Sequence, residues 1–198
     1  IGGMRNNIIY DFVVGYAHGI QYVNAMDQNQ AHMMSSFVGN FSDSTQAKAL
    51  ANMQYTSQAD VIFVAASQAG LGVIDEAQTQ NRYVIGVDSD QYDYYKTSNP
   101  QRAELIVTSV LKEVGNVIFD SVVAYMNDEL TFGTLVSYGL SDGIIDIADN
   151  ANYQAKVPEA LRDLIENLRG QIISGDLEVK SRFTMTLEEM NQLFASIE

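Results

Sequence analysis

The sequence contains no cysteine and no tryptophan, and it has only two prolines and two histidines among 198 residues. The absence of cysteine excludes disulfides and thiolate metal sites, and it is compatible with an extracytoplasmic location. Because His18 and His32 are the only histidines, we expect neither a histidine-rich metal site nor a catalytic triad. We therefore expect no metal and no cofactor.

Basic residues are also scarce. The 11 lysines and arginines face 25 acidic residues, which gives a formal net charge of -14. This balance argues against nucleic acid as a partner, because nucleic-acid binding needs clustered basic side chains, and against adhesion to anionic lipid. No run is long and apolar enough to span a bilayer, and no signal peptide is visible. The opening Ile1–Met4 resembles the interior of a domain, so we expect an N-terminal portion to be absent.

Residues 60–91 predict one strand–helix–strand unit. The runs Val61–Ala66 and Tyr83–Val87 are short, apolar and rich in β-branched residues, which is typical of buried parallel strands. The segment Leu71–Gln80 between them has helical periodicity, with Leu71, Ile74 and Ala77 or Gln78 on the face expected to lie on the sheet. Polar clusters follow both strands, at the carboxyl ends where ligands bind in open parallel sheets.

The rest of the chain continues this alternation. Strands that alternate with helices predict an α/β fold with a mostly parallel sheet. The other expected elements are a helix with Ile8 to Val23 on its inner face, a strand 31–39, a helix to about Tyr55 that opens at Asp43, which with Gln46 resembles a capping box, a loop 91–101, a strand 104–108, a helix from Ser109 to about Asn127 with Val110, Val114, Val117, Ile118, Val122 and Tyr125 inward, a strand 134–138, a turn 139–143, an edge strand 144–148, a loop 149–156, a helix from Pro158 to about Gly170, and a tail helix opened by the capping box of Thr186 and Glu189.

The loop after the first strand of the unit carries Ser67, Gly70 and Gly72. A pair of glycines at this place can bring backbone N–H groups to a phosphate or a hydroxyl group. The third glycine of a dinucleotide fingerprint is missing, because position 75 is aspartate, and no Gly-Lys-Ser/Thr follows. Two interpretations stay open, a loop that contacts a ligand and a helix start that only requires tight turning.

Asp88 and Asp90 follow the second strand. Two carboxylates there can bind a metal, act as acid and base, or accept hydrogen bonds from hydroxyl groups. A metal site usually needs a third anionic ligand, and the spacing reveals none. The alternative is a turn that the two side chains cap. A sugar or polyol would favour such acceptors, because hydrogen bonds to a carboxylate are stronger than neutral ones.

Two further side chains stand in unusual places. Phe41 is alone in the polar turn Asn40–Asp43, where an aromatic ring either covers the core or stacks on a flat ligand. Lys112 falls in the first turn of the helix predicted from Ser109, where the helix dipole disfavours a cation. Lys112 is therefore expected either to have an acidic partner or ligand, or to be an ordinary solvated lysine.

Several motifs occur together in one order. The chain resembles the basic membrane protein family of substrate-binding lipoproteins, which includes the purine nucleoside receptors of ABC importers. The resemblance covers residues 1–179 and is carried by Gly2-Gly3-Met4, Asp11-Phe12-x-x-Gly15-Tyr16-x-x-Gly19, Val38-Gly39-Asn40-Phe41-Ser42-Asp43 with Lys48, Ala59-Asp60-Val61-Ile62-Phe63, Ala65-Ala66-x-x-x-Gly70-x-Gly72, Ile85-Gly86-Val87-Asp88-Ser89-Asp90-Gln91, Thr108-Ser109-Val110-x-Lys112 and Tyr138-Gly139-Leu140-x-Asp142-Gly143.

The resemblance implies a two-lobed, hinged fold of the type I periplasmic-binding-protein kind, and a nucleoside, most simply a purine nucleoside, as the ligand. It implies that Phe41 stacks on the base, that Asp88 and Lys112 hold the ribose, and that the loop from Ser67 to Gly70 contacts the sugar. We also expect Asp90, at the same strand end as Asp88, to bind the ligand. We expect these side chains to meet at one rim of the sheet. It further implies an ABC permease as partner, no catalytic activity, and an extracytoplasmic place, either periplasmic or at the cell surface through an N-terminal lipid anchor outside this chain.

The resemblance also implies a division of the chain. Residues 1–130 are expected to form the second lobe, 131–180 the hinge return and part of the first lobe, and 181–198 a tail helix, with the N-terminal part of the first lobe absent. The family's usual Gly-Gly is Ser67-Gln68 here, which leaves the ligand open. The alternatives are a sugar- or autoinducer-binding protein of the same fold, the ligand-sensing core of a transcription regulator, and a nucleoside hydrolase that uses Asp88 and Asp90 with a divalent ion.

Overall fold

A computed structural model describes residues 1–26 and 30–197 of the chain. The chain divides into two compact units. The first unit comprises Ile1–Ile85 and Leu177–Glu198, and the second unit comprises Gly86–Asp176. Among the helices of the described residues, none combines the length and the apolar character that crossing a bilayer requires.

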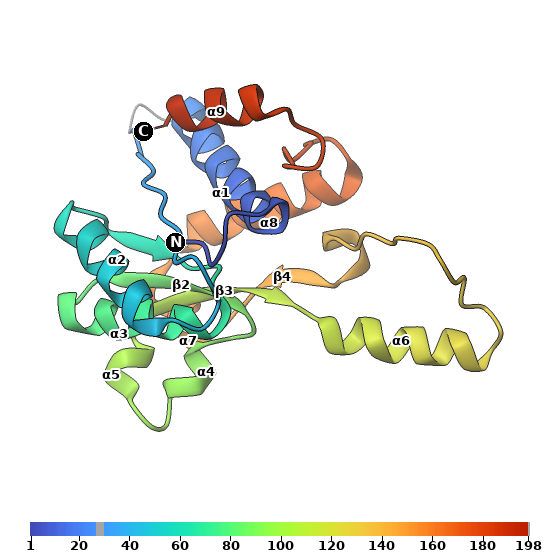
Figure 1. Ribbon diagram of the computed structural model, residues 1–198, viewed down its shortest axis with the longest axis horizontal. Helices are drawn as coiled ribbons and strands as arrows, with labels where there is room; N and C mark the ends of the chain where they lie inside the picture. The colour runs from blue at the N-terminus through green and yellow to red at the C-terminus, as the bar shows by residue number, and fades with distance from the viewer. Residues whose placement is uncertain (27–29, 198) are drawn as a thin grey trace. The chain divides into compact units, whose positions relative to one another are not determined.

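Strands and helices alternate along the chain, as Figure 1 shows. Within the described residues, four strands form one sheet in the order β1-β2-β3-β4, with β1 and β2 parallel and β3 and β4 antiparallel. The predicted α/β class with a mostly parallel sheet is confirmed. The elements are α1 (Asn7–Met26), α2 (Ser44–Thr56), β1 (Val61–Phe63), the 3-10 helix η1 (Ser67–Ala69), α3 (Gly70–Gln80), β2 (Tyr83–Asp88), α4 (Tyr92–Tyr95), α5 (Pro100–Ala103), β3 (Ile106–Lys112), α6 (Val114–Met126), the 3-10 helix η2 (Leu140–Asp142), β4 (Ile145–Ile147), α7 (Ala151–Lys156), α8 (Glu159–Ser174) and α9 (Leu187–Ala195).

In the first unit, α2 and α3 lie side by side. Asp43 caps α2 by accepting a hydrogen bond from the Gln46 backbone N–H at 2.9 Å, as the sequence predicts. The two helices approach so closely that a Cβ on Gly72 would lie 1.9 Å from the Ser44 carbonyl oxygen. Glycine at this position is therefore required for packing. The apolar side chains buried here include Ala47, Ala51, Ile62, Val64, Val73, Ile74, Ala77 and Val84.

A second apolar cluster of the first unit lies between α1 and α9. It contains Val14 and Ala17 of α1, Met33, and Met190, Leu193 and Ile197 at the C-terminal end. The predicted capping box of α9 is confirmed, because the Thr186 N–H donates to the Glu189 carboxylate at 2.7 Å and the Glu189 N–H donates to the Thr186 hydroxyl at 3.2 Å. The cap fixes the start of α9, and burial of its apolar face holds it against α1.

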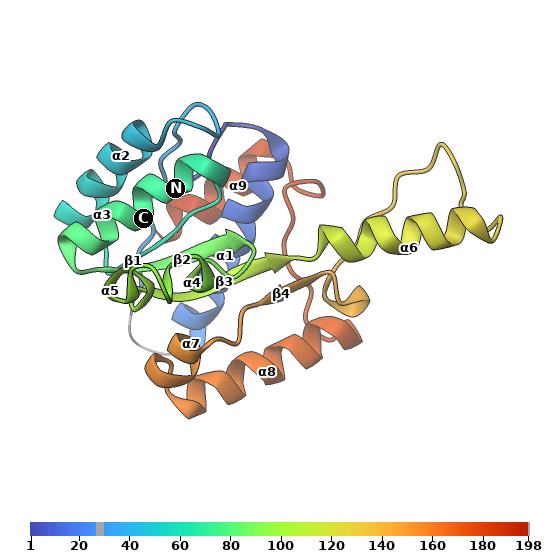
Figure 2. The same cartoon turned by 90° about the horizontal axis from the view of Figure 1, so that it is seen from below.

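In the second unit, α7 packs against β3. The buried Asn152 amide donates to the backbone carbonyls of Ala103 at 2.6 Å and Ile106 at 2.9 Å. Figure 2 shows α8 beside β4, where the Arg169 guanidinium pairs with the Asp146 carboxylate. These polar contacts satisfy groups that would be costly to bury alone.

The prediction that a helix begins at Ser109 is wrong. Strand β3 continues through Lys112, and Ser109 is fully buried, with its hydroxyl accepting a hydrogen bond from the Gln91 backbone N–H at 3.1 Å. Because the strand continues past Ser109, this serine does not cap a helix. Helix α6 begins at Val114 and buries none of its residues within the described chain, so its predicted inner face is wrong too.

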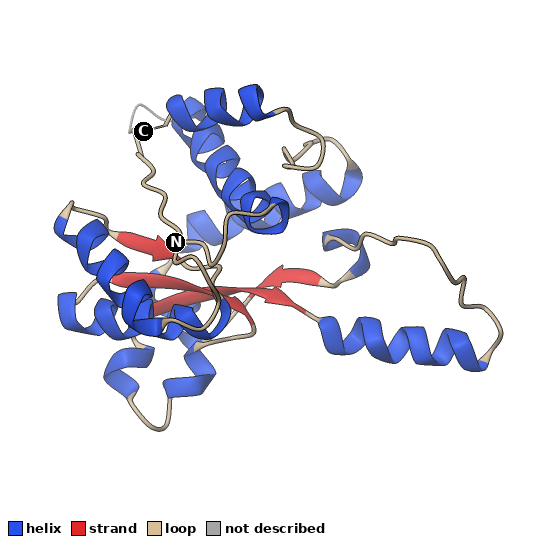
Figure 3. Cartoon of the chain, in the orientation of Figure 1, coloured by secondary structure: helices blue, strands red, loops and turns tan. Residues whose placement is uncertain are grey.

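The strand expected at 134–138 is also wrong, because Figure 3 shows this stretch as a loop. Leu135 is fully exposed, and the described residues offer no neighbouring strand for pairing, without which a strand does not persist. The strand expected at 31–39 is reduced to a single parallel bridge between Phe37 and Gly2.

Two predicted loops contain short helices. Asn99 caps α5 by accepting from the Arg102 N–H, with Pro100 at the first helical position, and Asn150 caps α7 by accepting from the backbone N–H groups of Asn152 and Tyr153. Helix α8 does not end near Gly170 but runs to Ser174, before Gly175 in the left-handed region at φ 81°.

Two predicted inner faces need correction. In α3 the buried residues are Val73, Ile74 and Ala77, whereas Leu71 is exposed. In α1 the buried residues include Ile9 and Val14, whereas Ile8 and Val23 at the two ends are exposed. Helical periodicity identified both helices but did not fix which residues of a broad apolar stripe face inward.

Candidate functional site

The clearest pair of predicted site residues lies at the ends of two strands in the second unit. Asp88 is the last residue of β2 and Lys112 is the last residue of β3. The Lys112 Nζ lies 2.8 Å from Asp88 Oδ1, and the two side chains keep 42% and 44% of their surface exposed. The structure thus brings these two residues together and leaves both accessible to a solute.

The backbone of Asp88 is in the left-handed region, with φ at 71°. Such a conformation costs an ordinary residue about 1–2 kcal/mol, and non-glycine residues of this kind cluster at functional sites. The conformation turns the chain sharply at the carboxyl end of β2. Asp88 is therefore held in an uncommon backbone conformation next to an amine.

Lys112 has the acidic partner that one sequence-based interpretation required, but the reason given for it was wrong. Lys112 ends a strand and pairs with Ile145 of β4 in the antiparallel ladder, so it does not lie in the first turn of a helix. The acidic partner is Asp88, at the end of strand β2.

Asp90 is engaged in holding its own loop. Its Oδ1 accepts a hydrogen bond from the Tyr92 backbone N–H at 3.1 Å and another from the Asn150 amide at 2.9 Å. Asn150 in turn caps α7. The capped turn considered for Asp90 is thus present, and a direct contact with a ligand stays a prediction. Asn150 was not predicted as a helix cap, although the Asp-Asn pair at this place is a typical start signal for a helix.

Two buried polar side chains beneath the end of β2 were also missed. A Cβ on Gly86 would lie 2.5 Å from both the Gln91 Oε1 and the Ser109 Oγ, so only glycine leaves room for them. Gln91 is buried, and its Oε1 has no hydrogen-bond partner among the described residues. Gly86 inside an apolar strand could have indicated these side chains, because a glycine in a strand often marks a place where other groups approach the backbone closely.

In the first unit, Phe41 lies over Gly3. A Cβ on Gly3 would be 2.3 Å from the Phe41 Cδ1, so a larger residue at position 3 would displace the ring. The Phe41 carbonyl accepts a hydrogen bond from the Ala69 N–H at 3.0 Å, which joins this turn to η1. The residue as a whole is 36% exposed. Phe41 is therefore held in place from one side and remains partly accessible.

Ser67 and Gly70 lie at the two ends of this joined loop. Ser67 is exposed and has a left-handed backbone, with φ at 50°. Gly70 is buried, and a Cβ on it would lie 3.1 Å from Val64 Cγ2. Tight packing explains the glycine at position 70, whereas Ser67 is an exposed residue that a solute can reach. The structure thus brings Phe41 together with the Ser67–Gly70 loop inside the first unit.

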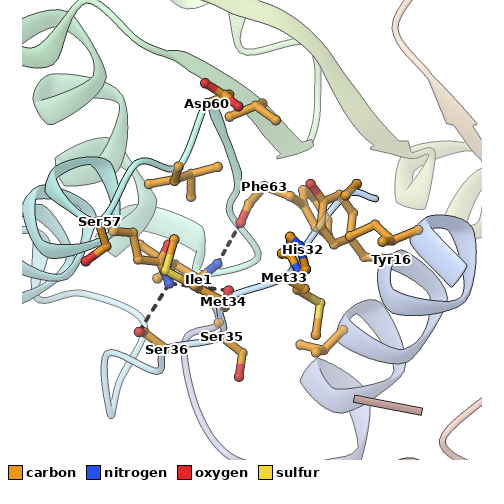
Figure 4. Close-up of a pocket in the computed structure, with 18 of the residues that line it drawn as sticks. Ile1, Tyr16, His32, Met33, Met34, Ser35, Ser36, Ser57, Asp60 and Phe63 are labelled. Carbon is orange, nitrogen blue, oxygen red and sulfur yellow. Dashed lines mark hydrogen bonds between the residues drawn. The ribbon is translucent and has the colours of Figure 1, made fainter. Parts of the chain in front are cut away.

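Across the described residues, no group of three or more histidine, aspartate or glutamate side chains is arranged to hold a metal ion. The first unit also contains a cavity of about 540 Å³ between α1 and the residues next to β1 (Figure 4). Phe41, Ser67 and Gly70 do not line it. The cavity is thus separate from the predicted site residues of the first unit.

The fold is similar to the crystal structure of an ABC transporter solute-binding protein from Aeropyrum pernix K1. The TM-score is 0.80 at 21% sequence identity, and the match covers 99% of this chain and 60% of that chain. This likeness defines the class of fold. It confirms the predicted α/β fold of the type I periplasmic-binding-protein kind.

Comparison of the sequence with known proteins identifies the family within this class of fold. Residues 1–178 match the family described as PnrA-like ABC transporter substrate-binding proteins, and the chain belongs to this family. It is 31% identical over 194 residues to the ABC transporter nucleoside-binding protein BmpA of Lactococcus lactis subsp. cremoris, covering 92% of this chain and 52% of that protein. It is 35% identical over 156 residues to basic membrane protein B of Borreliella burgdorferi, covering 77% and 42%. The chain thus spans about half the length of these relatives.

Proposed function

We propose that these residues belong to the nucleoside-binding component of an ABC importer. In this role the protein works outside the cytoplasm, binds a purine nucleoside without altering it chemically, and delivers it to a membrane permease. The family to which the chain belongs supports the transport role. The printed description of the Lactococcus relative as nucleoside-binding supports the choice of ligand.

The observation that carries the proposal is the pair of Asp88 and Lys112. A ribose ring presents two neighbouring hydroxyl groups, which donate well to a carboxylate and accept well from an ammonium group. A half-exposed carboxylate 2.8 Å from a half-exposed amine offers this combination of acceptor and donor. Because both groups end strands of one sheet, a sugar can contact them without rearrangement of the backbone.

The remaining assignments come from the resemblance and, for Asp90, from its place at the same strand end as Asp88. Phe41 stacks on the base, which suits a partly exposed aromatic residue whose position is fixed by Gly3 and η1. Ser67, Gly70 and Asp90 provide further contacts with the ligand, of which that of the exposed Ser67 is the best supported. The division into a second lobe at 1–130, a return at 131–180 and a tail at 181–198 also stays a prediction.

Titration calorimetry with inosine, guanosine, adenosine and free ribose tests the proposal. The measurement uses the full-length protein that contains these residues. We expect heat of binding with at least one nucleoside and no displacement of it by ribose. Absence of binding at millimolar nucleoside would contradict the proposal, whereas displacement by ribose would favour the sugar-binding alternative.

A further inference from the structure

The chain turns sharply at Asp88, directly at the end of β2. The Ser89 N–H donates to the Val87 carbonyl at 2.9 Å, and the backbone of Asp88 between them has φ at 71°. A hydrogen bond that closes three residues around a left-handed central residue is the rare, strained form of the γ-turn. Such a turn persists only where the surrounding structure imposes it.

The ion pair between Asp88 and Lys112 does not account for this turn. Both side chains are half-exposed, and an exposed ion pair contributes little because water and salt screen it. Lys112 carries its amine on a flexible four-carbon stem, so the pair can form with more than one backbone conformation at Asp88. The cause of the turn therefore lies in the residues that fix the chain before and after it.

Gln91 is fixed three residues after Asp88. Its backbone N–H donates to the hydroxyl of Ser109 at 3.1 Å, and Ser109 is fully buried in β3, the strand beside β2. The Gln91 carbonyl accepts a hydrogen bond from the Tyr94 N–H at 3.2 Å. The sheet thus holds the backbone of Gln91 through one side-chain oxygen, that of Ser109.

Asp90 is fixed as well, because its carboxylate accepts a hydrogen bond from the Asn150 amide at 2.9 Å. On the other side of the turn, Val87 is buried within β2. Only Asp88 and Ser89 remain to connect the strand to the next fixed residue. Two residues can span so short a path in few backbone conformations, because most combinations of φ and ψ are sterically forbidden. The anchors therefore explain why the tight turn is kept.

Gly86 provides the space for this contact between strands. A Cβ on Gly86 would lie 2.5 Å from both the Ser109 Oγ and the Gln91 Oε1. The Gln91 Oε1 is buried without a hydrogen-bond partner among the described residues, which is unfavourable for stability. An unsatisfied buried group in a folded protein calls for an explanation other than stability. The cluster thus carries a cost at the Gln91 side chain while it keeps the Gln91 backbone next to Ser109.

We propose that Ser109 is a positioning residue for the binding of the nucleoside and that it acts through Asp88. Its hydroxyl holds Gln91, which leaves the chain only a tight turn at Asp88. The turn sets where the Asp88 carboxylate stands beside Lys112. Ser109 is fully buried, so its effect on a ligand passes through other residues. The inference rests on the proposed function for its ligand, whereas the link from Ser109 to the turn is a property of the chain alone.

Thr108 provides a matched control. It precedes Ser109 in β3, and its buried hydroxyl donates to the Ala148 carbonyl at 2.7 Å. Its side chain points to the opposite face of the sheet from that of Ser109. Ser109→Ala and Thr108→Val each remove one buried hydroxyl and its hydrogen bond, so both should lower the midpoint of urea unfolding to a similar extent. Differences between the two variants therefore report on the turn and not on overall stability.

Hydrogen exchange measured by NMR on the full-length protein tests the link to the turn without any ligand. The Ser89 amide is the donor within the turn. We expect this amide to exchange about tenfold faster in Ser109→Ala than in Thr108→Val. Equal exchange of the Ser89 amide in the two variants would overturn the proposal.

Calorimetry with the nucleoside that the full-length protein binds best tests the consequence for binding. Ser109→Ala should raise Kd about fivefold, and Thr108→Val should leave it unchanged. In a protein that already carries Asp88→Ala, Ser109→Ala should change Kd less than about twofold, because its action passes through Asp88. An unchanged Kd in Ser109→Ala, or a rise of the same size in both backgrounds, would overturn the proposal.

Failure of this inference can be distinguished from failure of the proposed function. If the parent protein binds no nucleoside at millimolar concentration, the proposed function is contradicted, and exchange at Ser89 then decides whether Ser109 holds the turn. If the parent protein binds a nucleoside and Ser109→Ala binds it equally well, the proposed function stands and the positioning role of Ser109 is rejected.

Discussion

Two ion pairs of the second unit differ in what surrounds them. Asp88 and Lys112 meet at the ends of β2 and β3, and each keeps more than 40% of its side chain exposed. Asp146 of β4 and Arg169 of α8 are less exposed, at 37% and 25%. Arg169 also reaches Glu166 at 3.3 Å, and the Ile147 N–H donates to Asp146 at 2.6 Å.

The surroundings indicate different roles. The Asp146 carboxylate is engaged by a guanidinium and a backbone N–H, so it fastens α8 to β4 and has little capacity for a ligand. Burial raises the pKa of Asp146, but the hydrogen bonds from Arg169 and Ile147 and the charge of Arg169 outweigh it, and the pKa is lowered. Asp88 instead combines an exposed carboxylate with a strained backbone. We therefore propose that the first pair contacts the ligand and that the second is structural.

The largest expected effect is that of Asp88→Ala on nucleoside affinity. Removing a charged acceptor from the ribose should cost about 2–4 kcal/mol, or roughly a 30- to 1000-fold rise in Kd. The free energy of unfolding should barely change, because a half-exposed ion pair contributes about 0–1 kcal/mol. Calorimetry and urea unfolding of the same preparation measure both. Asp163→Ala, in an exposed position of α8, is the control, and an unchanged Kd for Asp88→Ala would remove Asp88 from the site.

Lys112→Met should have a smaller effect on binding. The amine donates to the sugar and orients Asp88, and a loss of about 1.4 kcal/mol would raise Kd about tenfold. Methionine keeps most of the length of the side chain, so the unfolding free energy should stay within about 0.5 kcal/mol of the parent. If Lys112→Met instead destabilises the fold and leaves Kd unchanged, the pair is structural and the contrast with Asp146 and Arg169 disappears.

Much of this arrangement could be predicted from the sequence where the signals are local. The strand–helix–strand unit follows from two β-branched runs around an amphipathic segment. The caps at Asp43 and Thr186 follow from residues three positions apart, and both are confirmed. The rule that ligand groups gather at the carboxyl ends of parallel strands places Asp88 at the end of a strand, where the structure also has it, and its contact with a ligand stays a prediction.

The errors arose where a distant residue decides the local structure. Ser109 has the composition of a helix cap, but its hydroxyl is taken by the Gln91 N–H, 18 positions away, and the strand continues. This mistake placed Lys112 on a helix and gave the wrong reason for its partner. Asn150 and Gln91 were missed because their partners, Asp90 and Gly86, come next to them only through the fold. Local propensity cannot show such contacts.

Arg169→Met tests the structural side of the comparison. Loss of the guanidinium should lower the free energy of unfolding by about 1 kcal/mol, the upper part of the range for partly exposed pairs, because the guanidinium makes more than one contact. Nucleoside affinity should stay the same, since this pair is assigned no role in binding. Urea unfolding and calorimetry measure the two quantities. A marked loss of affinity would show that the two pairs do not differ in role.

The smallest expected effect is a dependence of stability on acid. Asp146 has its pKa lowered from 3.8 in the folded protein, so the carboxylate stabilises the fold above that value and loses its contribution as pH falls through the lower folded pKa. Urea unfolding between pH 5 and about pH 2 should therefore show a steeper loss of stability in the parent than in Asp146→Asn.

The cause of this acid dependence can be isolated with a double variant. If the hydrogen bonds and charge of Arg169 lower the pKa, then Asp146→Asn should flatten the acid profile much less when Arg169→Met is already present. An equal flattening in both backgrounds would mean that the Ile147 N–H alone holds the carboxylate. In that case the Arg169 contact would be as dispensable to the fold as the Lys112 contact is expected to be, and exposure alone would no longer separate a structural pair from a binding pair.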